Sequence, residues 1–298
     1  MTKDWIKQYF NLMMSEDYEL AFQLKEQHFP KSFYKYRKLN CKTIENISDN
    51  YLFLAEIASL NDPFECSLQL DNNESLRRTF SNINYREDFK RYFGKELTSD
   101  DIKRINKSQH PLDTYSKICN EKNIPYNLTW DNLLEKVQKG WEQILDDSNK
   151  DIKICSFSEL NDSLLLWSHY ADEHKGICIE YDLENEDEIR PFLYPIMYSD
   201  KIYKISCDDF RALRALGSSL IKSKDWEYEA EWRLTILRQR EVFSNKITVT
   251  NPKAVFLGTR FHLNTADIKG KLLDILEKKK VPVYQMKKHS EEFKLVKQ

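Results

Sequence analysis

The chain has 298 residues, of which 41% are hydrophobic and 13% aromatic. This composition excludes a disordered chain and predicts a folded protein with a substantial core. The 46 basic and 48 acidic residues leave a formal net charge of −2, so the overall charge gives no argument for a nucleic acid or an anionic membrane as partner.

Glycine and cysteine usage excludes several classes of protein. The six glycines form no GxGxxG, Walker or GxSxG motif, so classical dinucleotide folds, phosphate-loop ATPases and α/β-hydrolases are poor candidates. The six cysteines include no CxxC pair, so we expect no metal site. The start of the chain lacks the apolar core of a secretory signal, and no segment approaches the roughly 18 apolar residues of a membrane helix. We expect a cytoplasmic protein without a membrane partner.

The first part of the chain alternates short helices and strands. Residues 3–28 predict one or two amphipathic helices, and "SFYKYRKL" (32–39) predicts a strand. "CKTIENISDN" (41–50) is typical of a short helix or turn, and "YLFLAEI" (51–57) of a second strand, which the turn "NDPF" (61–64) closes.

From about residue 74 to 150 the sequence is polar, charged and mostly helical. Ser99 and Thr129 are the expected N-caps of two of its helices, because acidic residues follow each of them in the first turn. We interpret 74–150 as a helical insertion in a single domain that spans 1–298, with N-terminal helices at 1–30.

The second half, 151–298, is rich in strands. The expected strands are 151–158, 176–182, 194–200, 226–237, 245–250, 254–261, 281–286 and 292–298. The expected helices are 162–174, with Asp162 as N-cap, 208–224 and 265–279. Strands without regular βαβ alternation favour an α+β fold with a mixed, largely antiparallel sheet over a doubly wound one.

Two early motifs carry candidate site residues. In "FYKYR", alternation places Tyr34 and Tyr36 on one strand face and Arg37 on the other, at a strand end where it can hold a phosphate or carboxylate bidentately. In "NDPF", Asn61 and Asp62 form the tip of a turn that can lie beside a cleft. The alternatives are a surface arginine and a turn that merely reverses the chain.

A third motif is "CSFSELNDSLLLWSHYADEHKGICIEY" (155–181). Ser156 and Ser158 share one face at the end of a strand, and Trp167, His169 and Tyr170 lie near the end of the next helix. Because consecutive helical residues cannot both face the core, we expect one of the last two to line a cavity with Trp167. A structural histidine is the alternative.

The fourth motif is "WEYEAEWRL" (226–234), which alternates with period two. On a strand, Glu229 and Glu231 project side by side, roughly 7 Å apart. Such a carboxylate can accept a hydrogen bond from a sugar hydroxyl and stabilise an oxocarbenium-like centre, which is the chemistry of glycosyl transfer. The packed side is formed by Trp226, Tyr228 and Trp232, and the alternative is a solvated acidic face.

The order of these elements resembles that of the arginine–serine–glutamate class of ADP-ribosyltransferases. The resemblance implies NAD as a substrate and an ADP-ribosyltransferase-like fold. It also implies that Arg37 orients NAD, that Tyr36 and Tyr170 frame the nicotinamide, and that Glu231 stabilises the oxocarbenium. The catalytic candidates are Glu231, Glu229 and His169. The candidates for binding the nucleotide are Tyr34, Tyr36, Arg37, Asn61, Asp62, Ser156, Ser158, Trp167 and Tyr170.

Taken together, "FYKYR", "NDPFE", "CSFSELNDSLLLWSHYADEHKGICIEYD" and "WEYEAEWR" resemble a bacterial family catalogued as domain of unknown function 2971, over about residues 32–261. Leu60 stands where that family commonly has phenylalanine before its NDPFE turn. The family name implies no settled activity, but the resemblance implies a bacterial toxin or a phage-defence effector.

Three functions therefore stay open. The first is an ADP-ribosyltransferase-like enzyme whose acceptor is a nucleic acid or a protein. The second is a nucleic-acid-directed effector, with His169, Arg37 and the carboxylates as its acid–base set and "KRYFGK" (90–95) on phosphates. The third is a non-catalytic sensor or interaction protein, in which Glu231 forms a structural salt bridge with Arg37 or Arg233. Whether Arg37, His169, Tyr170 and Glu231 line one cleft discriminates among them.

Overall fold

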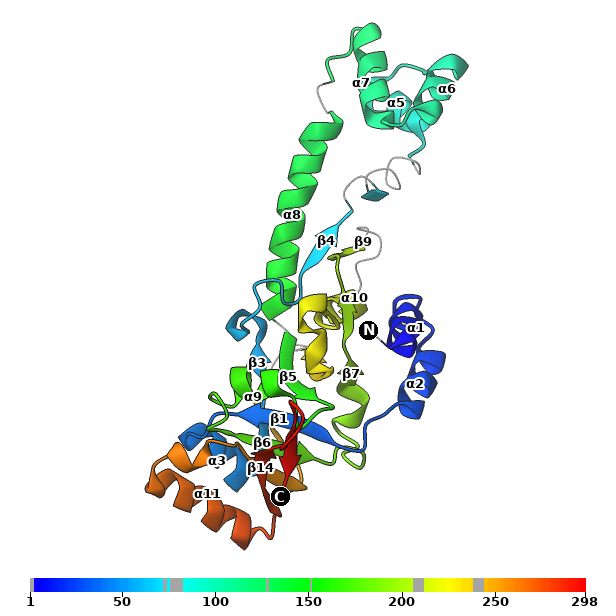
Figure 1. Cartoon of the computed structure of the whole chain (residues 1–298). Helices are drawn as coiled ribbons and strands as arrows, with labels where there is room; N and C mark the ends of the chain where they lie inside the picture. Colours follow the sequence, from blue (N-terminus) through cyan, green and yellow to red (C-terminus); the bar gives the residue numbers. More distant parts are fainter. Residues whose placement is uncertain are drawn as a thin grey trace. The chain divides into compact units, whose positions relative to one another are not determined.

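The computed structural model describes residues 3–71, 74–75, 83–126, 129–150, 152–205, 212–237 and 244–298. The chain divides into two compact units (Figure 1). The first unit comprises Met1–Ser67, Asn149–Lys201 and Leu216–Gln298, and the second comprises Leu68–Ser148 and Ile202–Ala215. The helical segment that we predicted at 74–150 accounts for most of the second unit.

The first unit is built on a nine-stranded sheet, which confirms the predicted α+β class with a largely antiparallel sheet. The strand order is β15 (Leu295–Lys297), β14 (Val283–Lys288), β13 (Ala254–Leu257), β6 (Ile177–Tyr181), β1 (Phe33–Arg37), β5 (Ile152–Ser158), β11 (Glu231–Leu237) and β7 (Leu193–Pro195), with β3 (Ala55–Glu56) also paired to β5. Neighbouring strands are antiparallel except β13 and β14, which are parallel. Two small sheets pair β2 (Tyr51–Phe53) with β12 (Lys246–Thr248) and β8 (Met197–Ser199) with β10 (Ile221–Ser223).

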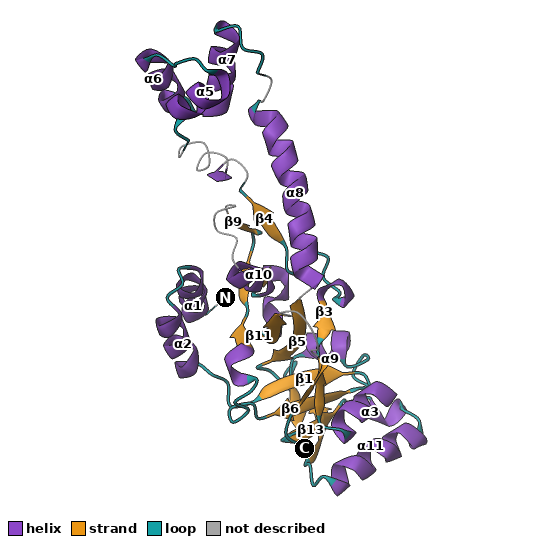
Figure 2. Ribbon diagram, turned by 180° about the vertical axis from the view of Figure 1, so that it is seen from behind, coloured by secondary structure: helices purple, strands orange, loops and turns teal. Residues whose placement is uncertain are grey.

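The two faces of this sheet are covered by different helices. Alternation along β1 sends Phe33 into a core under α3 (Cys41–Ser48) and α11 (Ala266–Lys278), which lie side by side in Figures 1 and 2. Tyr36 points to the opposite face, where Trp167 of α9 (Leu164–Tyr170) packs against its ring. The period-two pattern in "FYKYR" is therefore confirmed.

The remaining elements of the first unit largely follow the sequence. Two helices, α1 (Asp4–Met14) and α2 (Tyr18–Gln27), form the N-terminus, and short 3₁₀ helices span Ile57–Ser59, Arg190–Phe192 and Phe261–Leu263. The predicted helix 208–224 ends earlier, as α10 (Ala212–Ser219), and its first residues 208–211 lie outside the described part of the chain. The cap of α9 is Ser163, whose hydroxyl accepts from the Leu166 amide, and not Asp162 as predicted.

The predicted strand 226–237 is wrong in its first half. Residues Lys224–Glu229 form a 3₁₀ helix, which the Ser223 hydroxyl caps by accepting from the Asp225 amide. Ala230 ends this helix in the left-handed region, with φ of 43°, and β11 begins only at Glu231. The two glutamates of "WEYEAEWRL" therefore lie on different elements.

Four helices whose full extent the structure describes lie wholly or almost wholly in the second unit. They are α5 (Tyr85–Phe93), α6 (Ser99–Lys107), α7 (Pro111–Glu121) and α8 (Trp130–Lys150), and β4 (Leu68–Leu70) pairs with β9 (Tyr203–Ile205). The cap of α6 is Thr98, which forms a capping box with Asp101, and not Ser99 as predicted. The Thr129 hydroxyl accepts from the Asn132 amide at the start of α8, so its capping role is confirmed.

Candidate functional site

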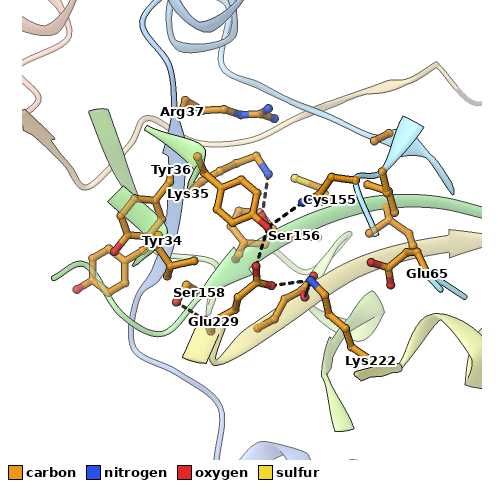
Figure 3. A pocket seen from close by; sticks show the side chains of 18 of the residues that line it. Tyr34, Lys35, Tyr36, Arg37, Glu65, Cys155, Ser156, Ser158, Lys222 and Glu229 are labelled. Carbon is orange, nitrogen blue, oxygen red and sulfur yellow. Dashed lines mark hydrogen bonds and ion pairs between the residues drawn. The ribbon is translucent and has the colours of Figure 1, made fainter. Parts of the chain in front are cut away.

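A gap along one edge of β5 forms a pocket in the first unit. On this edge β5 pairs with β1 only at Tyr34–Ser158, and it pairs with β3 from Ala55–Ile154 onward. Between these two pairings, residues 155–157 have no partner strand on this edge within the described chain. A cavity of about 200 Å³ lies there, and we call it the strand-gap pocket (Figure 3).

Two cations from β1 line this pocket. The Lys35 Nζ donates to the Ser156 carbonyl oxygen at 2.7 Å, across the gap, and lies 5.1 Å from the centre of the Phe157 ring. Burial lowers the pKa of Lys35, because it removes the ammonium from water. The Arg37 guanidinium makes no hydrogen bond or ion pair with any described residue. The Arg37 guanidinium is thus available to an anionic ligand, and Lys35 has donors left besides the one that bonds Ser156.

A buried charge cluster forms another wall of the pocket. Its members are Glu65, Lys222, Glu229, Glu231 and Arg233, all at most 9% exposed. The Lys222 Nζ lies 2.6 Å from Glu229 Oε2 and 3.1 Å from Glu231 Oε2, as Figure 3 shows in part. Arg233 grips Glu231 through Nε (2.6 Å) and Nη2 (3.2 Å), and its Nη1 donates to the Ser219 carbonyl at 2.8 Å and lies 2.5 Å from Glu65 Oε1.

The pKa values of the two central glutamates of this cluster are shifted in opposite directions. Burial would raise the pKa of Glu231, but the charges of Arg233 and Lys222 outweigh burial and hold that pKa well below its ordinary value. Burial and the negative charge of Glu231 raise the pKa of Glu229, and Lys222 compensates only in part. Glu231 therefore holds its negative charge more strongly than Glu229, and Glu229 binds a proton more readily. With three carboxylates and two cations, the cluster carries one net negative charge when every group is ionised.

Tyr170 links this cluster to the mouth of the pocket. Its hydroxyl donates to Glu229 Oε1 at 2.7 Å and lies 3.5 Å from Asn61 Nδ2. Burial, followed by the charge of Glu229, raises the pKa of Tyr170, so the phenol stays protonated as a donor. The Ser158 hydroxyl donates to the Glu229 carbonyl at 2.6 Å and fixes the backbone just before the left-handed Ala230.

The structure brings together nine of the twelve predicted site residues. The lining includes Tyr34, Tyr36, Arg37, Asn61, Ser156, Ser158, Tyr170, Glu229 and Glu231.

The other three do not line the pocket. Trp167 is fully buried, stacks edge-on against Tyr36 and donates to the Asn161 carbonyl. Asp62 forms the turn by accepting from the Phe64 amide at 2.8 Å. His169 is exposed, with its ring 6.2 Å from that of Tyr228. His169 therefore does not line this pocket, because the helix turns Tyr170 inward instead, and its catalytic role stays a prediction.

Three charged lining residues were not among the predicted site residues, namely Lys35, Glu65 and Lys222. Lys35 sits in "FYKYR" and Glu65 in "NDPFE", so both lay within motifs that the sequence had already singled out. Lys222 carries no local signal, because the parallel pairing of β10 with β8 positions it.

Among the described residues, no group of three or more His, Cys, Asp or Glu side chains is arranged to hold a metal ion. No helix within the described ranges is long and apolar enough to cross a membrane. Comparisons of the chain with protein-family models, curated proteins and solved structures find no match.

Proposed function

We propose that the strand-gap pocket binds NAD and that the protein is an ADP-ribosyltransferase-like enzyme. One observation carries this proposal: Arg37, Ser156 and Glu231, which come from three different strands, line a single cavity. Their order along the chain is the one that resembles the arginine–serine–glutamate enzymes. A role in phage defence or as a toxin, on a protein or nucleic-acid acceptor, belongs to the same proposal.

The chemistry of the lining suits the nicotinamide end of NAD. Arg37 and Lys35 supply donors for pyrophosphate oxygens, and the rings of Tyr34, Tyr36 and Tyr170 supply surfaces for the nicotinamide. A cavity of about 200 Å³ is smaller than the roughly 300–1,000 Å³ typical of sites that enclose whole ligands. We therefore place the nicotinamide and its ribose inside the pocket and the adenosine at its mouth.

The reaction breaks the bond between ribose C1′ and the nicotinamide nitrogen, and the bonding electron pair leaves with nicotinamide. Positive charge then develops on the ribose, and the net negative charge of the buried cluster stabilises it in a site screened from water. An acceptor oxygen or nitrogen forms the new bond to C1′ and gives its proton to Glu229. The raised pKa of Glu229 suits that proton transfer, because a base works best with a pKa near the operating pH.

The two glutamates have different roles in this reaction. Two cations, Arg233 and Lys222, hold Glu231 and keep its pKa low, so Glu231 acts through its charge and by holding those cations. Glu229 has one cationic partner, Lys222, and its other oxygen accepts from Tyr170, which connects it to the mouth of the pocket, so we assign the proton transfer to Glu229.

The test combines binding with turnover. Calorimetry with NAD measures binding, and chromatography of free nicotinamide measures cleavage. Glu229→Gln is expected to lower nicotinamide release by at least about a hundredfold, the usual contribution of a general base. Glu159→Gln is the matched control, because Glu159 is an ion-paired carboxylate that bonds Lys3 and Trp232 outside the pocket. Failure of NAD to bind, or undiminished release by Glu229→Gln, would sink the proposal.

A non-catalytic nucleotide sensor is the second candidate. The observation in its favour is that every charged group of the buried cluster already has a partner of opposite charge. It predicts that NAD binds without releasing nicotinamide and that Arg37→Ala abolishes this binding while leaving the fold intact.

A further inference from the structure

A second cavity lies at the carboxyl ends of β13 and β14, the one parallel pair in the nine-stranded sheet as described. Parallel strands end at the same edge, and in open α/β sheets ligands bind in the crevice outside the carboxyl ends of the strands. Arg260 follows β13 by three residues and Lys288 is the last residue of β14, so the topology places both at this edge. A cavity of about 440 Å³, which we call the hairpin cavity, is lined by these two residues, His174 and the turn 289–294 before β15.

The backbone around Arg260 is held in place. The Arg260 amide donates to the His174 carbonyl at 2.9 Å, and the Gly258 amide donates to the Gly176 carbonyl at 3.0 Å. The approach is so close that a Cβ at position 258 would lie 2.1 Å from the His174 oxygen. Residues 172–174 all adopt left-handed backbone angles, with φ of 48°, 53° and 69°. Strained backbone of this kind persists where the surroundings enforce it, and it often marks a functional site.

The positive charges of Arg260 and Lys288 at the hairpin cavity are not neutralised by ion pairs with described residues. Neither Arg260 nor Lys288 forms an ion pair with a described residue. The acids nearby are mostly engaged: Asp172 and Glu173 pair with Lys175, and Glu292 pairs with Lys294, which leaves only Glu291 in the lining.

His174 completes the set of polar groups. The Ser168 hydroxyl donates its one hydrogen to the Leu164 carbonyl, so it can only accept from His174 Nε2, 3.2 Å away. The other ring nitrogen, Nδ1, is buried and has no hydrogen-bond partner. Burial, and then the charges of Arg260 and Lys288, lower the pKa of His174. A bound anion would reverse the effect of those two charges.

We propose that the hairpin cavity binds the phosphate group of a small phosphate ester, with Arg260 and Lys288 as its donors. The volume suits a nucleoside monophosphate, and the fully exposed ring of Phe293 in the lining offers a surface for its base. This site is independent of the strand-gap pocket and of the activity proposed there.

The test uses adenosine 5′-monophosphate and orthophosphate as probes, titrated by calorimetry into the full chain at low ionic strength. Arg260→Gln and Lys288→Gln are each expected to weaken binding by about tenfold or more, the usual effect of removing a charge-assisted hydrogen bond. Lys287→Gln is the matched control, because Lys287 is the exposed neighbour that strand alternation turns to the other face. It should leave the affinity unchanged.

A second readout follows His174 itself by NMR, with its signal assigned from a His174→Gln spectrum. Its pKa should be higher in sodium sulfate than in sodium chloride of equal ionic strength, because bound sulfate offsets the charges of Arg260 and Lys288. Equal affinity for the two phosphate probes would mark a simple phosphate site, and tighter binding of the nucleotide would show that the nucleoside contributes. The proposal is overturned if neither probe binds, if both variants bind like the control, or if the pKa of His174 is the same in the two salts.

Discussion

Replacing Arg233 with methionine tests the energetics of the buried charge cluster. Arg233 is 1% exposed, and its removal leaves Glu65 and Glu231 without their main partner. The net charge of the cluster changes from one negative to two negatives in an environment that solvates charge poorly. Breaking a buried ion pair in this way costs about 3–5 kcal/mol. For a folding unit of roughly 150–250 residues, this corresponds to a fall of about 6–20 °C in Tm.

The measurement is urea and thermal unfolding, followed by tryptophan fluorescence and circular dichroism. Arg104→Met is the matched control, because Arg104 also grips a carboxylate through two nitrogens, at 2.9 and 2.8 Å from Glu121, but with a side chain 48% exposed. It should cost far less than Arg233→Met, because water screens an exposed ion pair. Because Arg104 lies in the second unit, its effect also shows which transition belongs to which unit.

A double substitution completes this test. Arg233→Met together with Glu231→Gln should cost less than the sum of the two single changes, because each single change deprives the other charge of one of its two ion-pair partners. A cost below about 1 kcal/mol for Arg233→Met alone, or strict additivity of the pair, would refute the view that these charges stabilise one another.

Three further outcomes are expected. Glu231→Gln should flatten the dependence of the free energy of unfolding on pH below 4.5. The folded-state pKa of this carboxyl is lowered, so its contribution to stability is present above the ordinary carboxyl pKa and is lost as the pH falls. An unchanged acid limb in pH-dependent urea unfolding would contradict this. Gly258→Ala should destabilise the first unit by several kcal/mol in thermal unfolding, because the new Cβ would meet the His174 carbonyl. Gly270 lies on a helix with open space around it, so Gly270→Ala should instead stabilise the unit by up to about 1 kcal/mol. Lys25→Met should remove a rise in the free energy of unfolding between pH 8 and 10.5. Burial lowers the pKa of Lys25 to about 8, so in this range the unfolded chain binds more protons than the folded protein. Equal slopes for the variant and the unchanged protein in alkaline urea titrations would exclude this.

The sequence predicted the elements best where the signals are local. The strand ends at β1 and β5, and both ends of α11, lie within one or two residues of their predicted positions, because alternation and helix period depend on near neighbours. The start of β11 was misplaced because "WEYEAEWRL" alternates as a strand does, while the cap at Ser223 and the left-handed Ala230 make a 3₁₀ helix there.

The sequence predicted which residues line the site better than it predicted how they are arranged. Glu229 and Glu231 were expected side by side on one strand, but they meet instead at the ammonium of Lys222. That meeting depends on the pairing of β10 with β8, which no local pattern specifies. The choice between His169 and Tyr170 likewise required the packing of α9, because a helical period alone left both orientations open.

Because β1 and β3 share one edge of β5, the size of the strand-gap pocket and the chemical groups that line it depend on different features of the fold. The distance between the two partner strands is fixed by their register on β5, with Tyr34 opposite Ser158 and Ala55 opposite Ile154. A shift of β3 along β5 by two residues would widen or narrow the opening by roughly 7 Å, while Arg37, Ser156 and the glutamates kept their places on their own elements. The size of the opening can therefore change without an exchange of any of these charged and hydroxyl groups.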